Sequence, residues 1–120
     1  MKKFSDLVED AKIGVMEISI HDVGEKIINE ENVHIVDVRE DNEWEKGHIC
    51  GAIHLSRGII ERDIGKIIKD AGAEIVLYCA RGYRSVLAAE SLMKMGYRNV
   101  KSMIGGYKEW EKAGHLISRE

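Results

Sequence analysis

Proline is absent from this chain of 120 residues, and cysteine occurs only twice, as Cys50 and Cys79. Two cysteines are too few for a disulfide framework, and neither belongs to a C-x-x-C pair. We therefore expect a reducing setting, the cytoplasm, in which a thiol stays available for chemistry. Without proline, the 12 glycines must supply most of the turns.

Long apolar stretches and a strong charge of one sign are also missing. No apolar run approaches the ~20 residues that span a bilayer, and the first residues turn acidic by Glu9 without an apolar signal segment. The net charge is −3, which gives no general footprint for nucleic acid. We expect a single domain over residues 1–120, with a core at about 14–113 and short frayed ends, that binds neither membrane nor nucleic acid. The lack of an apolar stripe favours a monomer or weak dimer.

Apolar, β-branched runs alternate along the chain with segments of helical period. Strands are predicted at 15–18, 34–38, 52–55, 74–78 and 100–104. Helices are predicted at 19–29, 41–46, 62–71, 85–95 and from 107 onward. This alternation with short connections predicts an α/β fold of parallel strands with helices on both faces. In such sheets ligands bind at the carboxyl ends of the strands.

The clearest chemical signal is the segment 78–85, which reads Tyr-Cys-Ala-Arg-Gly-Tyr-Arg-Ser. The most apolar strand stops at Cys79, and the next helix is predicted to begin at Ser85. A thiol that faces a helix N-terminus lies where backbone N–H groups and the helix dipole favour negative charge. Arg81 and Arg84 add positive charge beside it. These conditions favour a nucleophilic thiolate and an anionic substrate.

Simpler interpretations exist for the same residues. Cys79 is alternatively a structural thiol, because free cysteine is often buried. Arg81 and Arg84 are alternatively solvated surface charges, and of the two we expect Arg84 to face the site. Asp37 and Arg39 end another predicted strand, where a polar pair more often ties loops together than takes part in chemistry. From there they can still orient the cysteine loop.

Four segments resemble the rhodanese-like single-domain sulfurtransferases. They are 36–39 (Val-Asp-Val-Arg), 47–55 (Gly-His-Ile-Cys-Gly-Ala-Ile-His-Leu), the cysteine loop as far as Ala89, and 105–110 (Gly-Gly-Tyr-Lys-Glu-Trp). They occur in the family's order and spacing, and the resemblance runs from about Val33 to Trp110. It implies a three-layer α/β/α sandwich on a mainly parallel five-stranded sheet.

The resemblance also implies an activity. Cys79 would take the outer sulfur of a small anionic donor such as thiosulfate, become a persulfide, and pass that sulfur to a thiophilic acceptor. The acceptor would be cyanide in an assay, and a thiol or a sulfur-carrier protein in the cell. No cofactor and no metal is expected.

The remaining residues of the loop would bind the substrate. Backbone N–H groups would surround the transferred sulfur, the arginines would attract the donor, and glycine would let the loop close tightly. The serine would cap the helix. The second tyrosine lies at the crown of the loop, where it contacts either a partner at the rim or the substrate. The residues concerned are Ala80, Arg81, Gly82, Tyr83, Arg84 and Ser85.

Loop length separates this function from its main competitor. Cysteine phosphatases and arsenate reductases share the fold but have a Cys-x5-Arg loop, which fits a tetrahedral oxyanion. Here the loop from Cys79 to Arg84 is Cys-x4-Arg, and Tyr78 stands where a histidine would precede the cysteine. Sulfur transfer is therefore favoured. A non-catalytic module for protein binding or redox sensing is the alternative, with arsenate reductase or phosphatase behind it.

Cys50 departs from the family's usual pattern, because proline is common in that loop. Two hypotheses follow: a small apolar filler, or a resolving thiol that forms a disulfide with Cys79. The second requires the two Cα atoms to lie within about 7 Å.

Overall fold

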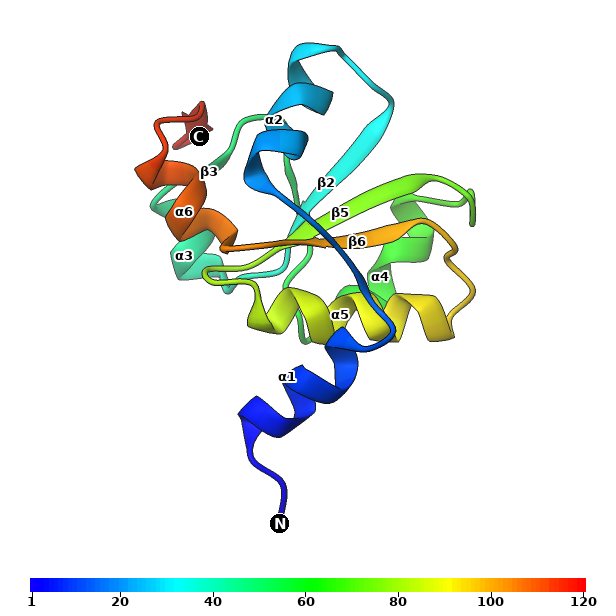
Figure 1. Ribbon diagram of the computed structural model, residues 1–120. Coiled ribbons are helices and arrows are strands. Elements are labelled where there is room, and N and C mark those ends of the chain that lie inside the picture. Colours follow the sequence, from blue (N-terminus) through cyan, green and yellow to red (C-terminus); the bar gives the residue numbers. More distant parts are fainter.

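A sheet of five parallel strands forms the centre of the computed structural model, which describes residues 1–120 (Figure 1). The strand order is β1-β6-β5-β2-β4, and every pairing between neighbours is parallel. The strands are β1 (Met16–Ile18), β2 (Val33–Asp37), β4 (Ile53–His54), β5 (Glu74–Tyr78) and β6 (Val100–Met103). β5 occupies the middle of this order, so its carboxyl end lies at the centre of the sheet's edge.

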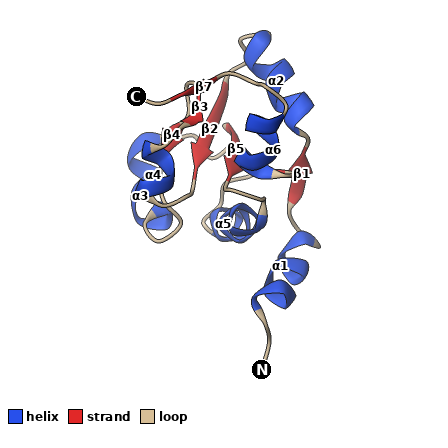
Figure 2. Cartoon of the chain, turned by 90° about the vertical axis from the view of Figure 1, so that its left-hand side faces the viewer, coloured by secondary structure: helices blue, strands red, loops and turns tan.

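Helices cover both faces of the sheet (Figure 2). One core contains buried side chains of α1 (Phe4–Lys12), α4 (Ile60–Ile67) and α5 (Tyr83–Lys94). A second core contains those of α2 (Ile20–Ile28) and α6 (Gly106–Lys112). The expected three-layer α/β/α sandwich is confirmed.

The alternation of side chains along β5 explains the two cores. Ile75 and Leu77 lie in the first core, whereas Val76 and Tyr78 lie in the second. Successive side chains of a strand point to opposite faces, so a strand covered on both sides must be apolar throughout. All four side chains have no exposed surface.

Smaller elements complete the chain. The short helix α3 (Asp41–Glu45) follows β2, and β3 (His48–Ile49) pairs antiparallel with β7 (Ile117–Ser118) in a separate two-stranded sheet. None of the helices is both long and apolar enough to cross a membrane.

The structure differs from the sequence-based expectation at several boundaries. α1 was not predicted, because the N-terminus was expected to fray; it forms with Val8 and Ala11 buried against the core. α4 begins at Ile60 and ends at Ile67, earlier than the predicted 62–71, because Ile68 adopts an extended backbone conformation. α5 begins at Tyr83 with Gly82 as its N-cap, so Ser85 lies inside the first turn and does not cap the helix as expected. The pairing of β3 with β7 was not predicted.

Candidate active site

Cys79 directly follows β5 and begins the loop that leads into α5. Only 1% of the residue is exposed. Asp37 at the end of β2 and Ser102 in β6 belong to the two strands that flank β5, so the carboxyl ends of three neighbouring strands surround the loop. This is the edge at which parallel sheets bind their ligands.

Two backbone N–H groups of the loop donate to the thiol. The N–H of Gly82 lies 3.1 Å from the Cys79 Sγ, and that of Ser85 lies 3.4 Å from it. The Ser85 Oγ is 3.5 Å from the same sulfur and 2.8 Å from the Ser102 Oγ. Gly82 has φ +95°, a left-handed conformation that glycine adopts without strain. The sulfur therefore accepts hydrogen bonds at the start of α5, where negative charge is stabilised.

The carbonyl groups of the loop are held by α6 on the other side. The N–H of Tyr107 donates to the Cys79 carbonyl at 2.8 Å, and that of Lys108 donates to the Ala80 carbonyl at 3.0 Å. Gly106 permits this contact, since a Cβ atom there would lie 2.5 Å from the Cys79 carbonyl oxygen. The Gly105-Gly106 pair was predicted only as a turn. This pair of glycines also lets α6 bind the carbonyl groups of Cys79 and Ala80, so that these carbonyls do not face the sulfur.

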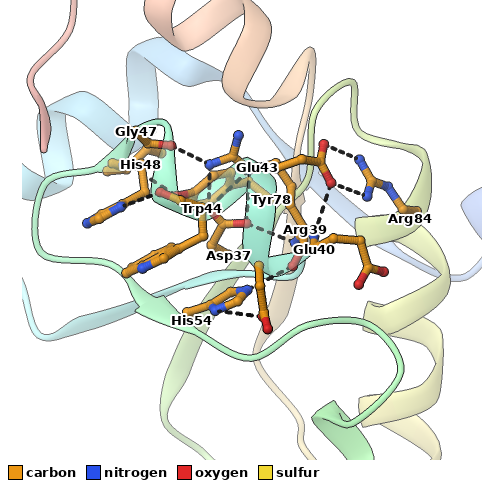
Figure 3. Close-up of polar contacts among 12 residues, drawn as sticks. Asp37, Arg39, Glu40, Glu43, Trp44, Gly47, His48, His54, Tyr78 and Arg84 are labelled. Carbon is orange, nitrogen blue, oxygen red and sulfur yellow. Dashed lines mark hydrogen bonds and ion pairs between the residues drawn. The ribbon is translucent and has the colours of Figure 1, made fainter. Parts of the chain in front are cut away.

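The two arginines of the loop have different environments. Arg84 forms a bidentate ion pair with Glu43 of α3, with N–O distances of 2.8 and 3.1 Å (Figure 3). The hydrogen bonds from Arg84 lower the pKa of Glu43 to about 2. Arg81 is exposed and forms no ion pair or side-chain hydrogen bond with the rest of the chain. Although the sequence favoured Arg84 as the arginine facing the site, its charge is already balanced, whereas that of Arg81 is not.

A pocket of about 390 Å³ opens above the loop. Its walls combine apolar and cationic side chains from the loop with one aromatic ring from α1. The lining residues are Phe4, Cys79, Ala80, Arg81, Tyr83 and Arg84. The Tyr83 side chain is 46% exposed. The sequence did not point to Phe4, and it did not point to Glu43 because that contact spans 41 positions.

Asp37 and Arg39 form a buried ion pair behind the loop (Figure 3). The Arg39 guanidinium donates to both Asp37 carboxylate oxygens at 2.8 to 3.1 Å and to the Gly47 carbonyl at 2.6 Å. It also lies 4.2 Å from the Tyr107 ring centroid. Burial works to lower the pKa of Arg39, but its hydrogen bonds and charge attraction to Asp37 outweigh burial and raise it. Neither residue lines the pocket. Their contacts connect the end of β2 to the segment that contains Gly47, which indicates a structural role.

Tyr78, which stands where phosphatases have histidine, points away from the pocket into the second core. Its hydroxyl oxygen accepts a hydrogen bond from the Ile49 N–H at 3.0 Å. Burial raises the pKa of Tyr78, so its hydroxyl remains protonated. This residue supports the fold rather than the chemistry.

Cys50 does not line the pocket at Cys79. It is exposed and contributes to a separate pocket of about 200 Å³ beside Trp110 and Leu116, which shares no lining residue with the pocket at Cys79. This exposed position does not fit the hypothesis of a small apolar filler.

The fold and the loop together define a class: α/β/α domains in which a cysteine follows the central strand and its sulfur accepts hydrogen bonds from backbone amides at the start of the next helix. The family model described as "Rhodanese-like domain" matches residues 21–113. The chain belongs to the rhodanese-like domain family.

Two relatives show how far the likeness extends. GlpE of Coxiella burnetii, a thiosulfate sulfurtransferase, is 32% identical over 93 residues, covering 78% of this chain and 84% of the relative. YrkF of Bacillus subtilis, named as a proposed sulfur carrier protein, is 33% identical over 96 residues. That match covers 80% of this chain but only 51% of YrkF, so the chain spans about half of that relative's length.

A solved structure shares nearly the whole fold. A protein from Rhodopseudomonas palustris, described as of unknown function and as a possible tyrosine phosphatase, superposes with a TM-score of 0.86. It is 27% identical, and the alignment covers 98% of this chain and 96% of that one.

Proposed function

We propose that this protein is a thiosulfate sulfurtransferase that carries sulfur as a persulfide on Cys79 and works in the reducing cytoplasm. The Cys79 thiolate attacks the outer sulfur of thiosulfate, the S–S bond of the donor breaks, and sulfite leaves with the bonding electron pair. An acceptor then attacks the outer sulfur of the persulfide. With cyanide the product is thiocyanate, and the Cys79 thiolate is regenerated. A thiol or a sulfur-carrier protein takes the place of cyanide in the cell.

The orientation of the loop amides carries this proposal. The N–H groups of Gly82 and Ser85 already donate to the Cys79 Sγ, while α6 binds the carbonyls of Cys79 and Ala80. A persulfide extends the side chain by one sulfur, and its negative charge then lies beside the same N-terminal turn of α5. Fixed N–H dipoles aimed at developing charge stabilise a transition state by several kcal/mol.

The relatives support the choice of sulfur chemistry. GlpE is named for thiosulfate sulfur transfer, and YrkF is named as a proposed sulfur carrier. We extend these activities to this chain because it has the cysteine, the glycine and the serine that form the sulfur-binding loop.

Phosphatase activity, suggested by the description of the Rhodopseudomonas structure, is less consistent with this loop. The Cys-x4-Arg loop is one residue shorter than the phosphatase loop. In addition, the arginine that would bind a phosphate, Arg84, is paired with Glu43 at 2.8 Å. A shorter loop, whose arginine is already paired with a carboxylate, suits one sulfur atom better than a tetrahedral oxyanion.

Intact mass spectrometry tests the proposal. After incubation with thiosulfate we expect a gain of one sulfur, which cyanide removes and which Cys79→Ala does not show. Cys50→Ala is the matched control, because it removes the other thiol and should keep the adduct. Rapid hydrolysis of p-nitrophenyl phosphate without an adduct would support a phosphatase. A protein inert in both assays would point to a non-catalytic module.

A further inference from the structure

The helix α1 contributes a wall to the sulfur-transfer pocket from outside the family match. Its residues, Phe4–Lys12, precede the matched range 21–113. It packs beside α5, as Figure 1 shows, with Val8 and Ala11 buried. Phe4 lies four positions before Val8 and therefore shares its helix face. This spacing brings the ring of Phe4 to the pocket at the start of α5.

The pocket has an apolar part in addition to its cationic part. Phe4 and Tyr83 line it beside Arg81 and Arg84. Both aromatic residues are about half exposed, at 53% and 46%, so a ligand that covers them gains burial energy. Inorganic thiosulfate is charged at every exposed surface and gains nothing from these rings.

The size of the pocket also exceeds the needs of an inorganic donor. Its 390 Å³ falls within the range of ~300–1,000 Å³ that is typical of pockets for small organic molecules. At ~30 Å³ for each water, the space equals roughly a dozen waters, whereas thiosulfate has five non-hydrogen atoms. An additional group on the donor therefore has room beside the aromatic residues.

On the basis of the proposed function, we propose that Phe4 determines specificity and selects organic thiosulfonates, R–SO2–S⁻ with an apolar R group, over inorganic thiosulfate. The Cys79 thiolate attacks the terminal sulfur, the S–S bond breaks, and the sulfinate R–SO2⁻ leaves with the electron pair. The persulfide on Cys79 is the same as with thiosulfate. The R group contacts Phe4 and Tyr83, and Arg81 attracts the anionic end.

Steady-state kinetics with two donors, benzenethiosulfonate and thiosulfate, tests this assignment with cyanide as the acceptor. The readout is the ratio of kcat/KM for the two donors, which cancels any effect common to both. We expect Phe4→Ala to lower this ratio about five- to tenfold, the effect of losing one aromatic pair. Phe4→Leu keeps apolar surface and should lower it less.

Leu7→Ala is the matched control. Leu7 lies on the same helix and is 47% exposed, but it does not line the pocket. The kcat/KM ratio of Leu7→Ala for the two donors should therefore stay within about twofold of that of the unmodified protein. Thermal unfolding of each variant shows whether α1 still packs.

The outcomes separate this inference from the proposed function. If both donors load Cys79 but Phe4→Ala leaves the ratio unchanged, or Leu7→Ala lowers it as much, the role of Phe4 is refuted and sulfur transfer stands. If neither donor yields a persulfide, the proposed function fails and the role of Phe4 fails with it.

Discussion

Arg81 and Arg84 lie three positions apart in the cysteine loop, yet only Arg84 has an acidic partner. An anionic donor therefore meets one uncompensated charge. Arg81→Ala should raise the KM for thiosulfate about fivefold at low salt, since an exposed charge pair is worth ~1 kcal/mol at 4 Å in water. Thiocyanate formation at several thiosulfate concentrations gives this value. The surface variant Arg62→Ala controls for net charge.

The double variant Arg84→Ala/Glu43→Gln removes the ion pair without leaving either charge alone. It should change the KM for thiosulfate less than Arg81→Ala does. A larger effect of the double variant would show that Arg84 leaves Glu43 to bind the donor.

Glu43 gives a pH-dependent prediction at the same scale. Its pKa is about 2 in the folded protein, against 4.5 without the structure. As the pH falls below about 5, the unfolded chain takes up a proton before the folded one does, so the ion pair's contribution to stability is lost toward pH 2. Glu43→Gln should therefore destabilise the protein by about 1 kcal/mol at pH 7, and progressively less below pH 5.

Urea unfolding of Glu43→Gln across this pH range measures the effect. Glu45→Gln, an exposed change on the same helix, is the control and should show no such trend. A stability difference that stays constant between pH 7 and pH 3 would contradict the assignment.

At the scale of elements, the contact between α6 and the cysteine loop depends on Gly106. This residue has φ +61°, and a Cβ atom would lie 2.6 Å from the Ala80 carbonyl oxygen as well as close to that of Cys79. Gly106→Ala should cost at least ~2 kcal/mol of stability through strain and overlap. It should also lower kcat at least tenfold, because the loop must shift.

Gly65→Ala is the matched substitution for Gly106→Ala. Gly65 lies within α4, and no atom would come within 4 Å of its Cβ. Stability should rise by up to ~1 kcal/mol, as expected for alanine in a helix, with kcat unchanged. If Gly106→Ala behaved in the same way, the proposed role of α6 in orienting the loop would be wrong.

The cysteine loop could be predicted because all its parts are contiguous: an apolar strand, the thiol, two arginines and a helix start. Glu43 could not, since its contact with Arg84 joins segments 41 positions apart. The sequence does contain a signal for α1, the spacing of Phe4, Val8 and Ala11 along one helix face. The strands β3 and β7 have two residues each, too few to show any periodicity.

At the scale of the whole molecule, alternating strands and helices predicted the sandwich. The order of strands depended on pairings that no local pattern contains. β5 joins two cores, because its successive residues face opposite layers. The fold should therefore unfold as one cooperative unit despite having a core on each face of the sheet.

Substitutions on the two faces test this cooperativity. Leu77→Ala removes side-chain volume from the core beneath α5, and Met103→Ala does so beneath α6; both residues are fully buried. Each should reduce the free energy of unfolding by 2–5 kcal/mol. Urea unfolding followed by circular dichroism and by fluorescence should give a single transition with an unchanged slope. Two separate transitions would mean that the layers fold independently.

A crystal structure of the thiosulfate-treated protein examines the sulfur site itself. We predict one additional sulfur atom bonded to the Cys79 Sγ and within hydrogen-bonding distance of several backbone nitrogens between Arg81 and Ser85. An unmodified Cys79, or an outer sulfur that points into solvent without contacting these nitrogens, would contradict the proposal that the loop is built to hold a persulfide.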